Sequence, residues 1–140
     1  VLHGPNLNLL GTREPGIYGA TTLAQIDAEL ARMAADAGAK LQSFQSNHEG
    51  ELIEKIQSSD SNFEGLIINP GGYSHTSVAI KDALELCAIP KVEVHLSNLA
   101  LREDFRNVML TASSCNGYIS GFREKGYLAA IYLLENIISN

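Results

Sequence analysis

The chain has 140 residues, of which 45% are hydrophobic and 19% charged, as expected for one ordinary globular domain spanning residues 1–140. Ten Lys and Arg residues against sixteen Asp and Glu residues give a net charge of −6, which argues against a general role on nucleic acids or membrane surfaces. A small anionic substrate remains compatible with this charge, because a few arginines can make a local positive site. We expect neither a membrane span, which needs ~18 consecutive apolar residues, nor a secretory signal.

Strand-like and helix-like segments alternate along the chain. Residues 1–3 read as the end of a first strand, whose start we expect to be missing. Residues 22–37 predict a helix, because Thr22 and Gln25 have the spacing of a capping box. Its apolar face carries Leu23, Ile26, Leu30, Met33 and Ala37. A strand at 40–45 follows. Ser46 and Glu49 repeat the capping-box spacing, and apolar residues then recur at helical spacing at Leu52, Ile53 and Ile56.

The second half of the chain continues this alternation. The apolar run at 65–69 predicts a strand buried on both faces. Residues 75–88 predict a helix with an inward face of Ala79, Ile80, Ala83, Leu84 and Cys87. Strands are expected at 90–96 and within 116–122, with a weak helical segment near 99–107 between them and a last helix at 126–139.

Five strand–helix units predict an α/β fold with a parallel sheet between two layers of helices. Five strands favour the flavodoxin-like three-layer sandwich, with strand order 2-1-3-4-5. Ligands of such sheets bind at the carboxyl ends of the strands, near the point where the strand order reverses. Strands one, three and four would be neighbours there.

Polar residues follow these three strands. The long loop after strand one carries Asn6, Asn8, Arg13 and Tyr18. Asn69, Tyr73, Ser74 and His75 follow strand three. Strand four carries Glu93 and His95, and Ser97, Asn98, Arg102 and Arg106 come after it. The topology therefore predicts one polar site built from three distant parts of the sequence.

Glu93 and His95 lie two residues apart on a strand, so they share a face, and the carboxylate could fix the tautomer of the imidazole. A satisfied core histidine is the other interpretation. His95 is then the candidate acid, and Tyr18 is the candidate base. A tyrosine is an unusual base, because a phenol is protonated at neutral pH unless a cation stabilises the phenolate. Arg13 is five residues away on the same loop. The length of the loop would then reflect a lid that brings a base and its activator over the pocket.

Other chemistries lack sequence support. No spacing of His and Cys suggests a metal site, and no glycine-rich phosphate loop follows a strand, so a nucleotide site has no support either. Gly71 and Gly72 could form only a turn, or could present backbone N–H groups to an anion. Arg102 and Arg106 could equally be a solvated face. We interpret Cys87 and Cys115 as small buried residues of a reducing compartment, which favours a cytoplasmic protein.

Four segments resemble the type II 3-dehydroquinate dehydratases nearly end to end: GPNLNLLGTREPGIYG (4–19), QSNHEGELIEKI (45–56), INPGGYSHTSVAIKDAL (68–84) and VEVHLSN with REDFR (92–98 and 102–106). The resemblance implies a flavodoxin-like lyase of the shikimate (aromatic amino acid biosynthesis) or quinate pathway. It would eliminate water from 3-dehydroquinate through an enolate to give 3-dehydroshikimate, without cofactor or metal. It also implies trimers packed into dodecamers.

The resemblance further implies individual catalytic roles. Tyr18 would take a proton from the carbon next to the ketone, and Arg13 would hold Tyr18 as phenolate. Asn6, helped by a bound water, would stabilise the enolate oxygen. His95 would protonate the departing hydroxyl while Glu93 orients the imidazole.

The implied substrate-binding residues are Asn69, His75 and Arg106 for the hydroxyls, and Leu96 and Ser97 for the carboxylate. Asp82 would reach the site of a neighbouring subunit. One segment departs from the family pattern: Asn107-Val108-Met109 follows Arg106 where a short polar run with serine is usual, which bears on the local support of Arg106. The competing hypotheses are a non-catalytic flavodoxin-like binding or assembly protein and, with less support, a flavin-binding protein.

Overall fold

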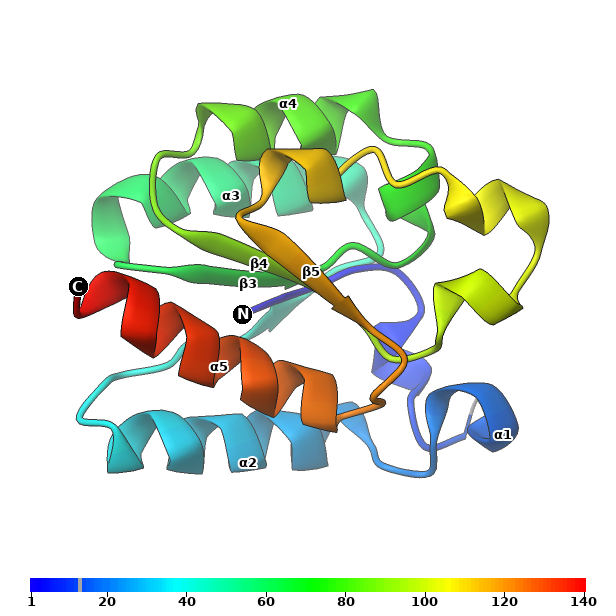
Figure 1. Ribbon diagram of the computed structural model, residues 1–140, viewed down its shortest axis with the longest axis horizontal. Helices are drawn as coiled ribbons and strands as arrows, with labels where there is room; N and C mark the ends of the chain where they lie inside the picture. Colours follow the sequence, from blue (N-terminus) through cyan, green and yellow to red (C-terminus); the bar gives the residue numbers. More distant parts are fainter. Residues whose placement is uncertain (13) are drawn as a thin grey trace.

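A five-stranded sheet with the order β2-β1-β3-β4-β5 forms the middle layer of the molecule (Figure 1). The computed structural model describes residues 1–12 and 14–140. The strands are β1 (Leu2–His3), β2 (Phe44–Gln45), β3 (Leu66–Asn69), β4 (Lys91–His95) and β5 (Gly117–Ser120). Each neighbouring pair is parallel, so the predicted fold class and strand order are confirmed.

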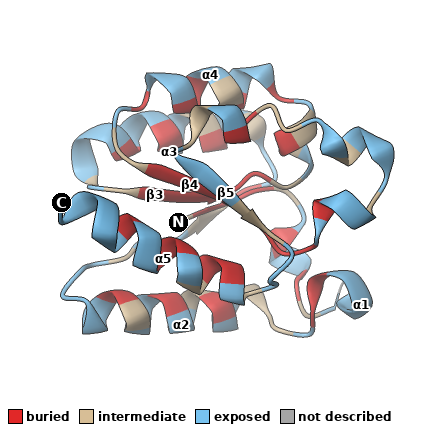
Figure 2. Ribbon diagram, in the orientation of Figure 1, coloured by how far each residue is buried: buried red, intermediate tan, exposed pale blue. Residues whose placement is uncertain are grey.

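Helices cover both faces of this sheet. Figure 1 shows α2 (Leu23–Asp36) and α5 (Lys125–Ile138) on one face, and α3 (Glu49–Asn62) and α4 (Val78–Leu86) on the other. Two apolar clusters fill the two interfaces. Ile67 of β3 belongs to one and Ile68 to the other, because successive side chains of a strand point to opposite faces. Both strands at the centre, β3 and β4, are therefore buried (Figure 2).

Strand β2 is shorter than the sequence predicts. Only Phe44 and Gln45 of the segment 40–45 pair, because β2 is an edge strand and its single partner, β1, offers two residues.

The helix after β3 also begins later than predicted. A short 3-10 helix, η2 (Gly71–His75), comes first, and α4 starts at Val78 because the Ser77 hydroxyl accepts the N–H of Ile80 at 2.9 Å. As a result Ala79 is exposed, contrary to the prediction that it faces inward.

One of the two capping boxes is present. The Thr22 hydroxyl accepts the N–H of Gln25 at 3.2 Å, and the Gln25 side chain accepts the N–H of Thr22 at 2.9 Å. The spacing at Ser46 and Glu49 does not make a second box. Helix α3 follows His48, and the Ser46 hydroxyl bonds the side chain of Glu51 instead.

Short helices crowd the edge where the strands end. After β1 come η1 (Leu7–Leu9) and α1 (Pro15–Tyr18), and after β4 come η3 (Leu99–Leu101) and η4 (Asp104–Asn107). The next short helix, η5 (Ala112–Ser114), lies against α4 at the start of β5. Figure 1 shows α1 and the yellow segments after β4 at the same end of the sheet. None of the described helices is long and apolar enough to cross a membrane.

Candidate active site

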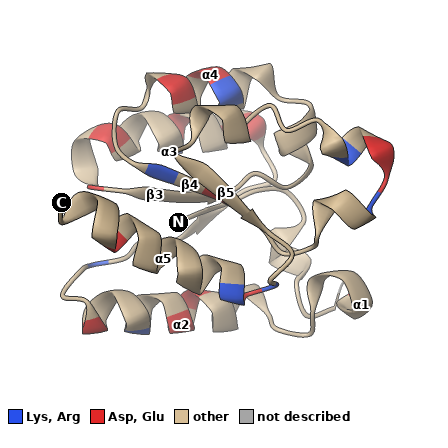
Figure 3. Ribbon diagram, viewed as in Figure 1, with Lys and Arg blue, Asp and Glu red and all other residues tan. Residues whose placement is uncertain are grey.

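Charged residues lie mainly on the outer surfaces of the helices and on the segment after β4 (Figure 3). Glu93 is an exception, because it is fully buried in the middle of the sheet. Nε2 of His95 donates to Oε1 of Glu93 at 2.6 Å, and the His95 side chain is 5% exposed. A carboxylate can only accept, so Nε2 carries the proton of this bond. Nδ1 is left as the ring nitrogen that can exchange a proton with a ligand.

The Glu93 carboxylate also accepts two hydroxyl hydrogen bonds. Ser74 of η2 donates to Oε1 at 2.9 Å, and Thr111 donates to Oε2 at 2.6 Å. The sequence places Ser74 after strand three without a role, and no motif in it points to Thr111. No sequence pattern connects Thr111 to Glu93, because the two residues are 18 positions apart and meet only in the folded chain.

His75 lies beside His95, with ring centroids 6.3 Å apart and planes at 25°. Nδ1 of His75 donates to the carbonyl of Val108 at 2.7 Å. Burial lowers the pKa of His75, helped by the neighbouring charges of His95 and Arg106, although the Val108 hydrogen bond opposes the shift. The imidazole is therefore held neutral, with Nε2 free to accept a hydrogen bond from a ligand hydroxyl.

The segment that departs from the family pattern is firmly attached to this cluster. Val108 provides the carbonyl for His75, and the N–H of Leu110 donates to the Ser74 carbonyl at 2.9 Å. Arg106 finds its support elsewhere: its Nε donates to Glu103 at 2.6 Å, and its guanidinium carbon lies 5.0 Å from the Phe105 ring centroid.

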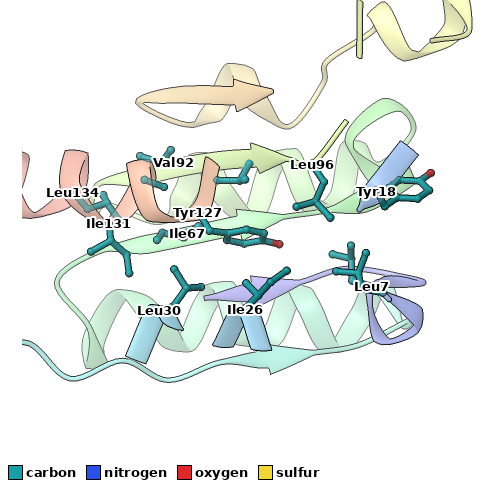
Figure 4. Close-up of a cluster of buried hydrophobic side chains, with 13 residues drawn as sticks. Leu7, Tyr18, Ile26, Leu30, Ile67, Val92, Leu96, Tyr127, Ile131 and Leu134 are labelled. Atoms are coloured by element: carbon teal, nitrogen blue, oxygen red, sulfur yellow. The ribbon is translucent and has the colours of Figure 1, made fainter. Parts of the chain in front are cut away.

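Tyr18 ends α1 and is 9% exposed. Its ring belongs to the same apolar cluster as Leu7 and Leu96, and Figure 4 shows the hydroxyl directed away from these side chains. The guanidinium carbon of Arg102 lies 5.3 Å from the Tyr18 ring centroid, and NH1 of Arg102 donates to the Ser97 hydroxyl at 3.3 Å. From the sequence alone Arg102 could belong to a solvated face, but its side chain is only 14% exposed.

Arg13, the predicted activator of Tyr18, lies outside the described residues. Among the residues that the structure describes, Arg102 lies against the Tyr18 ring. Through Arg102, Tyr18 is connected to Ser97, which follows His95 by two residues.

The loops after β1 and β3 cross at close range. Gly4 donates its N–H to the Asn69 carbonyl at 2.7 Å, and a Cβ on Gly4 would lie 2.5 Å from the Pro70 oxygen, so only glycine fits there. Asn69 is buried, and its Oδ1 accepts the N–H of Gly71 at 3.1 Å. Asn6 is exposed with φ of 68°, a left-handed conformation that asparagine tolerates.

Asp82 is positioned differently from the other predicted residues. It is exposed on α4, whereas Leu96 and Ser97 are buried at the end of β4. Within residues 1–12 and 14–140, no group of three or more His, Cys, Asp and Glu side chains could hold a metal ion. The clustered groups are those of proton transfer and hydrogen bonding.

Comparisons with known proteins show which family the chain resembles. The family model for class II dehydroquinase matches residues 1–135. The chain is 58% identical to 3-dehydroquinate dehydratase 1 of Ralstonia nicotianae over 134 residues, covering 94% of this chain and 85% of the relative. It is 50% identical to the 3-dehydroquinate dehydratase of Geotalea daltonii over 138 residues, covering 99% and 96%.

A solved structure gives the same result. The crystal structure of type II dehydroquinase from Butyrivibrio crossotus matches with a TM-score of 0.93 and 44% identity, covering 95% of this chain and 93% of that one. The chain belongs to the class II dehydroquinase family.

Proposed function

We propose that this chain is a hydro-lyase that removes water from 3-dehydroquinate to give 3-dehydroshikimate. The observation that carries the proposal is the buried Glu93–His95 pair, joined at 2.6 Å at the carboxyl end of β4. It lies in the part of the sheet where Tyr18, Arg102 and Ser97 also meet. The names of the relatives at 50–58% identity support the same reaction.

Proton abstraction falls to Tyr18. Its phenolate takes the proton from the carbon next to the ketone, and the electron pair left behind forms the enolate. On the basis of the family motif, Arg13 is proposed as the cation that holds Tyr18 as phenolate. Arg102 packs against the ring, with its guanidinium carbon 5.3 Å from the ring centroid. Asn6 stabilises the enolate oxygen with the help of a bound water.

Loss of the hydroxyl falls to His95. Nδ1 gives its proton to the departing oxygen, so water leaves as the enolate collapses to the conjugated enone. Glu93 carries the compensating negative charge while the imidazole is protonated, and its hydrogen bond to Nε2 keeps Nδ1 aimed at the substrate. General acids of this kind contribute typically about 10²–10⁴-fold to the rate.

Binding an anionic substrate to a chain of net charge −6 requires local donors. We assign the carboxylate to Ser97 and to the backbone N–H groups of Leu96 and Ser97. The substrate hydroxyls are assigned to Asn69, Arg106 and His75, whose neutral Nε2 suits a hydroxyl donor.

The test is an ultraviolet assay with purified chain and 3-dehydroquinate. A conjugated enone absorbs where the substrate does not, so dehydration should appear as a steady rise in absorbance. The matched control is His95→Ala, which should show almost no rise. Tight binding of 3-dehydroquinate without any enone would favour a non-catalytic binding protein instead, and a yellow flavin chromophore in the purified chain would favour the flavin-binding alternative.

Three further features belong to this proposal. We assign the chain to the cytoplasm, supported by its two free cysteines, Cys87 and Cys115. We also propose a homo-oligomer of trimers packed into a dodecamer. The exposed apolar residues Leu101, Phe105 and Val108, all on the segment after β4, support an interface near the site. The reaction then serves the shikimate or quinate pathway.

A further inference from the structure

Glu93 has more hydrogen-bond donors than the orientation of one histidine requires. Oε1 accepts from Ser74 at 2.9 Å and from His95 at 2.6 Å, and Oε2 accepts from Thr111 at 2.6 Å. Ser74, Glu93 and Thr111 are each 0% exposed. The three donors come from η2, from β4 and from the start of η5, so three separate elements converge on one carboxylate.

Thr111 directs its hydroxyl to Glu93 although it occupies a helix N-cap. A threonine at this position usually accepts a backbone N–H from the first turn of the helix that it precedes. Thr111 makes no such side-chain bond to η5. Its hydroxyl instead donates to Oε2 of Glu93. The Thr111 hydroxyl thus contacts the carboxylate that holds His95 and not the backbone of η5.

The backbone around Thr111 is tied to the same cluster. The N–H of Leu110 donates to the Ser74 carbonyl, and the carbonyl of Val108 accepts from His75. The segment 108–111 is therefore fixed to η2 at two points, which places the Thr111 hydroxyl without adjustment. Met109 lies on this segment, with its sulfur 3.9 Å from the Ser74 hydroxyl.

We propose that Thr111, together with Ser74, is a positioning residue for the Glu93–His95 pair. The terminal torsion of a glutamate side chain is soft, so a carboxylate held by one partner can rotate. Donors on both oxygens fix the plane of the Glu93 carboxylate, and with it the direction of the His95 ring. Hydrogen bonds to a charged acceptor are short and directional, as the 2.6 Å distances to Thr111 and His95 indicate. The inference rests on the proposed role of His95 as the acid.

The variant Thr111→Val removes the hydroxyl and keeps the shape. We expect it to lower kcat by about 10–100-fold, as the loss of an outer partner of a catalytic ligand does in metalloenzymes, with little change in KM. Thr111→Ser retains a hydroxyl and should recover most of the loss. The matched control is Ser113→Ala on the same short helix, whose exposed hydroxyl donates to the Leu110 carbonyl at 2.7 Å and should not matter.

A second readout does not depend on turnover. Long-range proton–nitrogen NMR correlations report which ring nitrogen of each histidine is protonated, with His95→Ala used to assign the His95 signals. Thr111→Val should shift or broaden the His95 ring signals, whereas Thr111→Ser and Ser113→Ala should leave them in place. If circular dichroism shows that Thr111→Val does not fold, Ser74→Ala, which removes one of the two donors on Oε1, is measured instead with the same expectation.

Unchanged kcat together with unchanged His95 signals in Thr111→Val would overturn the inference. A loss of kcat that Thr111→Ser fails to recover would also overturn it, because it would indicate a packing role. A different outcome separates the two proposals. If the wild-type chain produces no enone but the His95 signals still differ between wild type and Thr111→Val, the proposed function is contradicted and the positioning role stands.

Discussion

His95 and His75 differ in the partner that each ring meets. Nε2 of His95 donates to a buried carboxylate, which fixes the tautomer and the direction of the ring and leaves Nδ1 for the substrate. Nδ1 of His75 faces a carbonyl, and burial lowers the pKa of His75, so its ring stays neutral. Two adjacent imidazoles can thereby serve as an acid and as a hydrogen-bond acceptor. The two histidines differ in role because their hydrogen-bond partners differ, although the residue type is the same.

His95→Ala should lower kcat by about 10²–10⁴-fold and leave KM close to the wild-type value. The reason is that the proton of His95 is needed only as the hydroxyl departs. Steady-state kinetics measures both constants, and His48→Ala, at an exposed position, is the control. A raised KM with unchanged kcat would assign His95 to binding alone.

Tyr18→Phe should abolish nearly all turnover and leave substrate binding largely intact. The ring packs with Leu7 and Leu96 and should stay in place, because phenylalanine fills the same space. Calorimetric titration with a substrate analogue measures binding, and the enone assay measures turnover. If the variant retains wild-type kcat, the base must be sought elsewhere.

A buried pair away from the site makes stability depend on pH. His3 is fully buried between Tyr127, whose hydroxyl lies 2.9 Å from Nδ1, and Asp27, whose Oδ1 lies 2.9 Å from Nε2. Burial acts to raise the pKa of Asp27, but the hydrogen bond and charge of His3, with help from Ser43, outweigh it and hold that pKa below its usual value.

A depressed carboxyl pKa contributes stability above the unfolded value of about 4, and that contribution is lost as the pH falls through the folded pKa. Asp27→Asn should therefore destabilise the chain at about pH 7 and much less at about pH 3. Urea unfolding at the two pH values gives both free-energy differences. Equal differences at both would show that the Asp27 charge contributes nothing.

At the scale of elements, local sequence signals were reliable where a single helix decides the outcome. The Thr22–Gln25 box formed as predicted because both partners lie within one helical turn. The same spacing at Ser46 failed because Glu51 competes for the Ser46 hydroxyl. Similarly, the edge strand β2 begins later than predicted, at Phe44, because its pairing depends on the two residues of β1.

Thr22→Ala should destabilise the chain by about 1 kcal/mol, within the range of about 0.5–2 kcal/mol known for N-caps, because the Gln25 N–H loses its acceptor. Thr22→Ser keeps that acceptor and is the matched control. Denaturant unfolding measures both. If Thr22→Ala and Thr22→Ser unfold at the same denaturant concentration, the Thr22–Gln25 capping box does not contribute to stability.

In the candidate site, too, the sequence predicts contacts between residues close in the chain and misses those between distant ones. The Glu93–His95 pair was predictable because two residues on one strand share a face, and the structure brings them to 2.6 Å. Two other contacts could not be predicted, those of Arg102 with Tyr18 and of Thr111 with Glu93. Each joins segments that come together only through the path of the whole chain. Sequence patterns thus identify the reacting groups more readily than the residues that hold them.

At the scale of the whole molecule, the strand order determines which loops can cooperate. With the order β2-β1-β3-β4-β5, the loops after β1, β3 and β4 share one edge of the sheet, and all three contribute to the site. Asp82 lies outside this arrangement. Its neighbours on α4, Ile80, Ala83 and Leu84, are buried, while Asp82 itself is exposed on the outer side of that helix. A role in catalysis would therefore be exercised in the site of a second copy.

Subunit complementation tests this directly. If Asp82 acts across an interface, Asp82→Asn and His95→Ala should each be nearly inactive alone. Oligomers reassembled from a mixture should regain activity, because some sites then combine an intact His95 from one copy with an intact Asp82 from another. Glu85→Gln is the matched control, since Glu85 is an exposed acid of the same helix that pairs with Lys81 at 2.7 Å and should be fully active. Wild-type turnover in Asp82→Asn, or a sedimenting monomer that is active at assay concentration, would contradict the shared site.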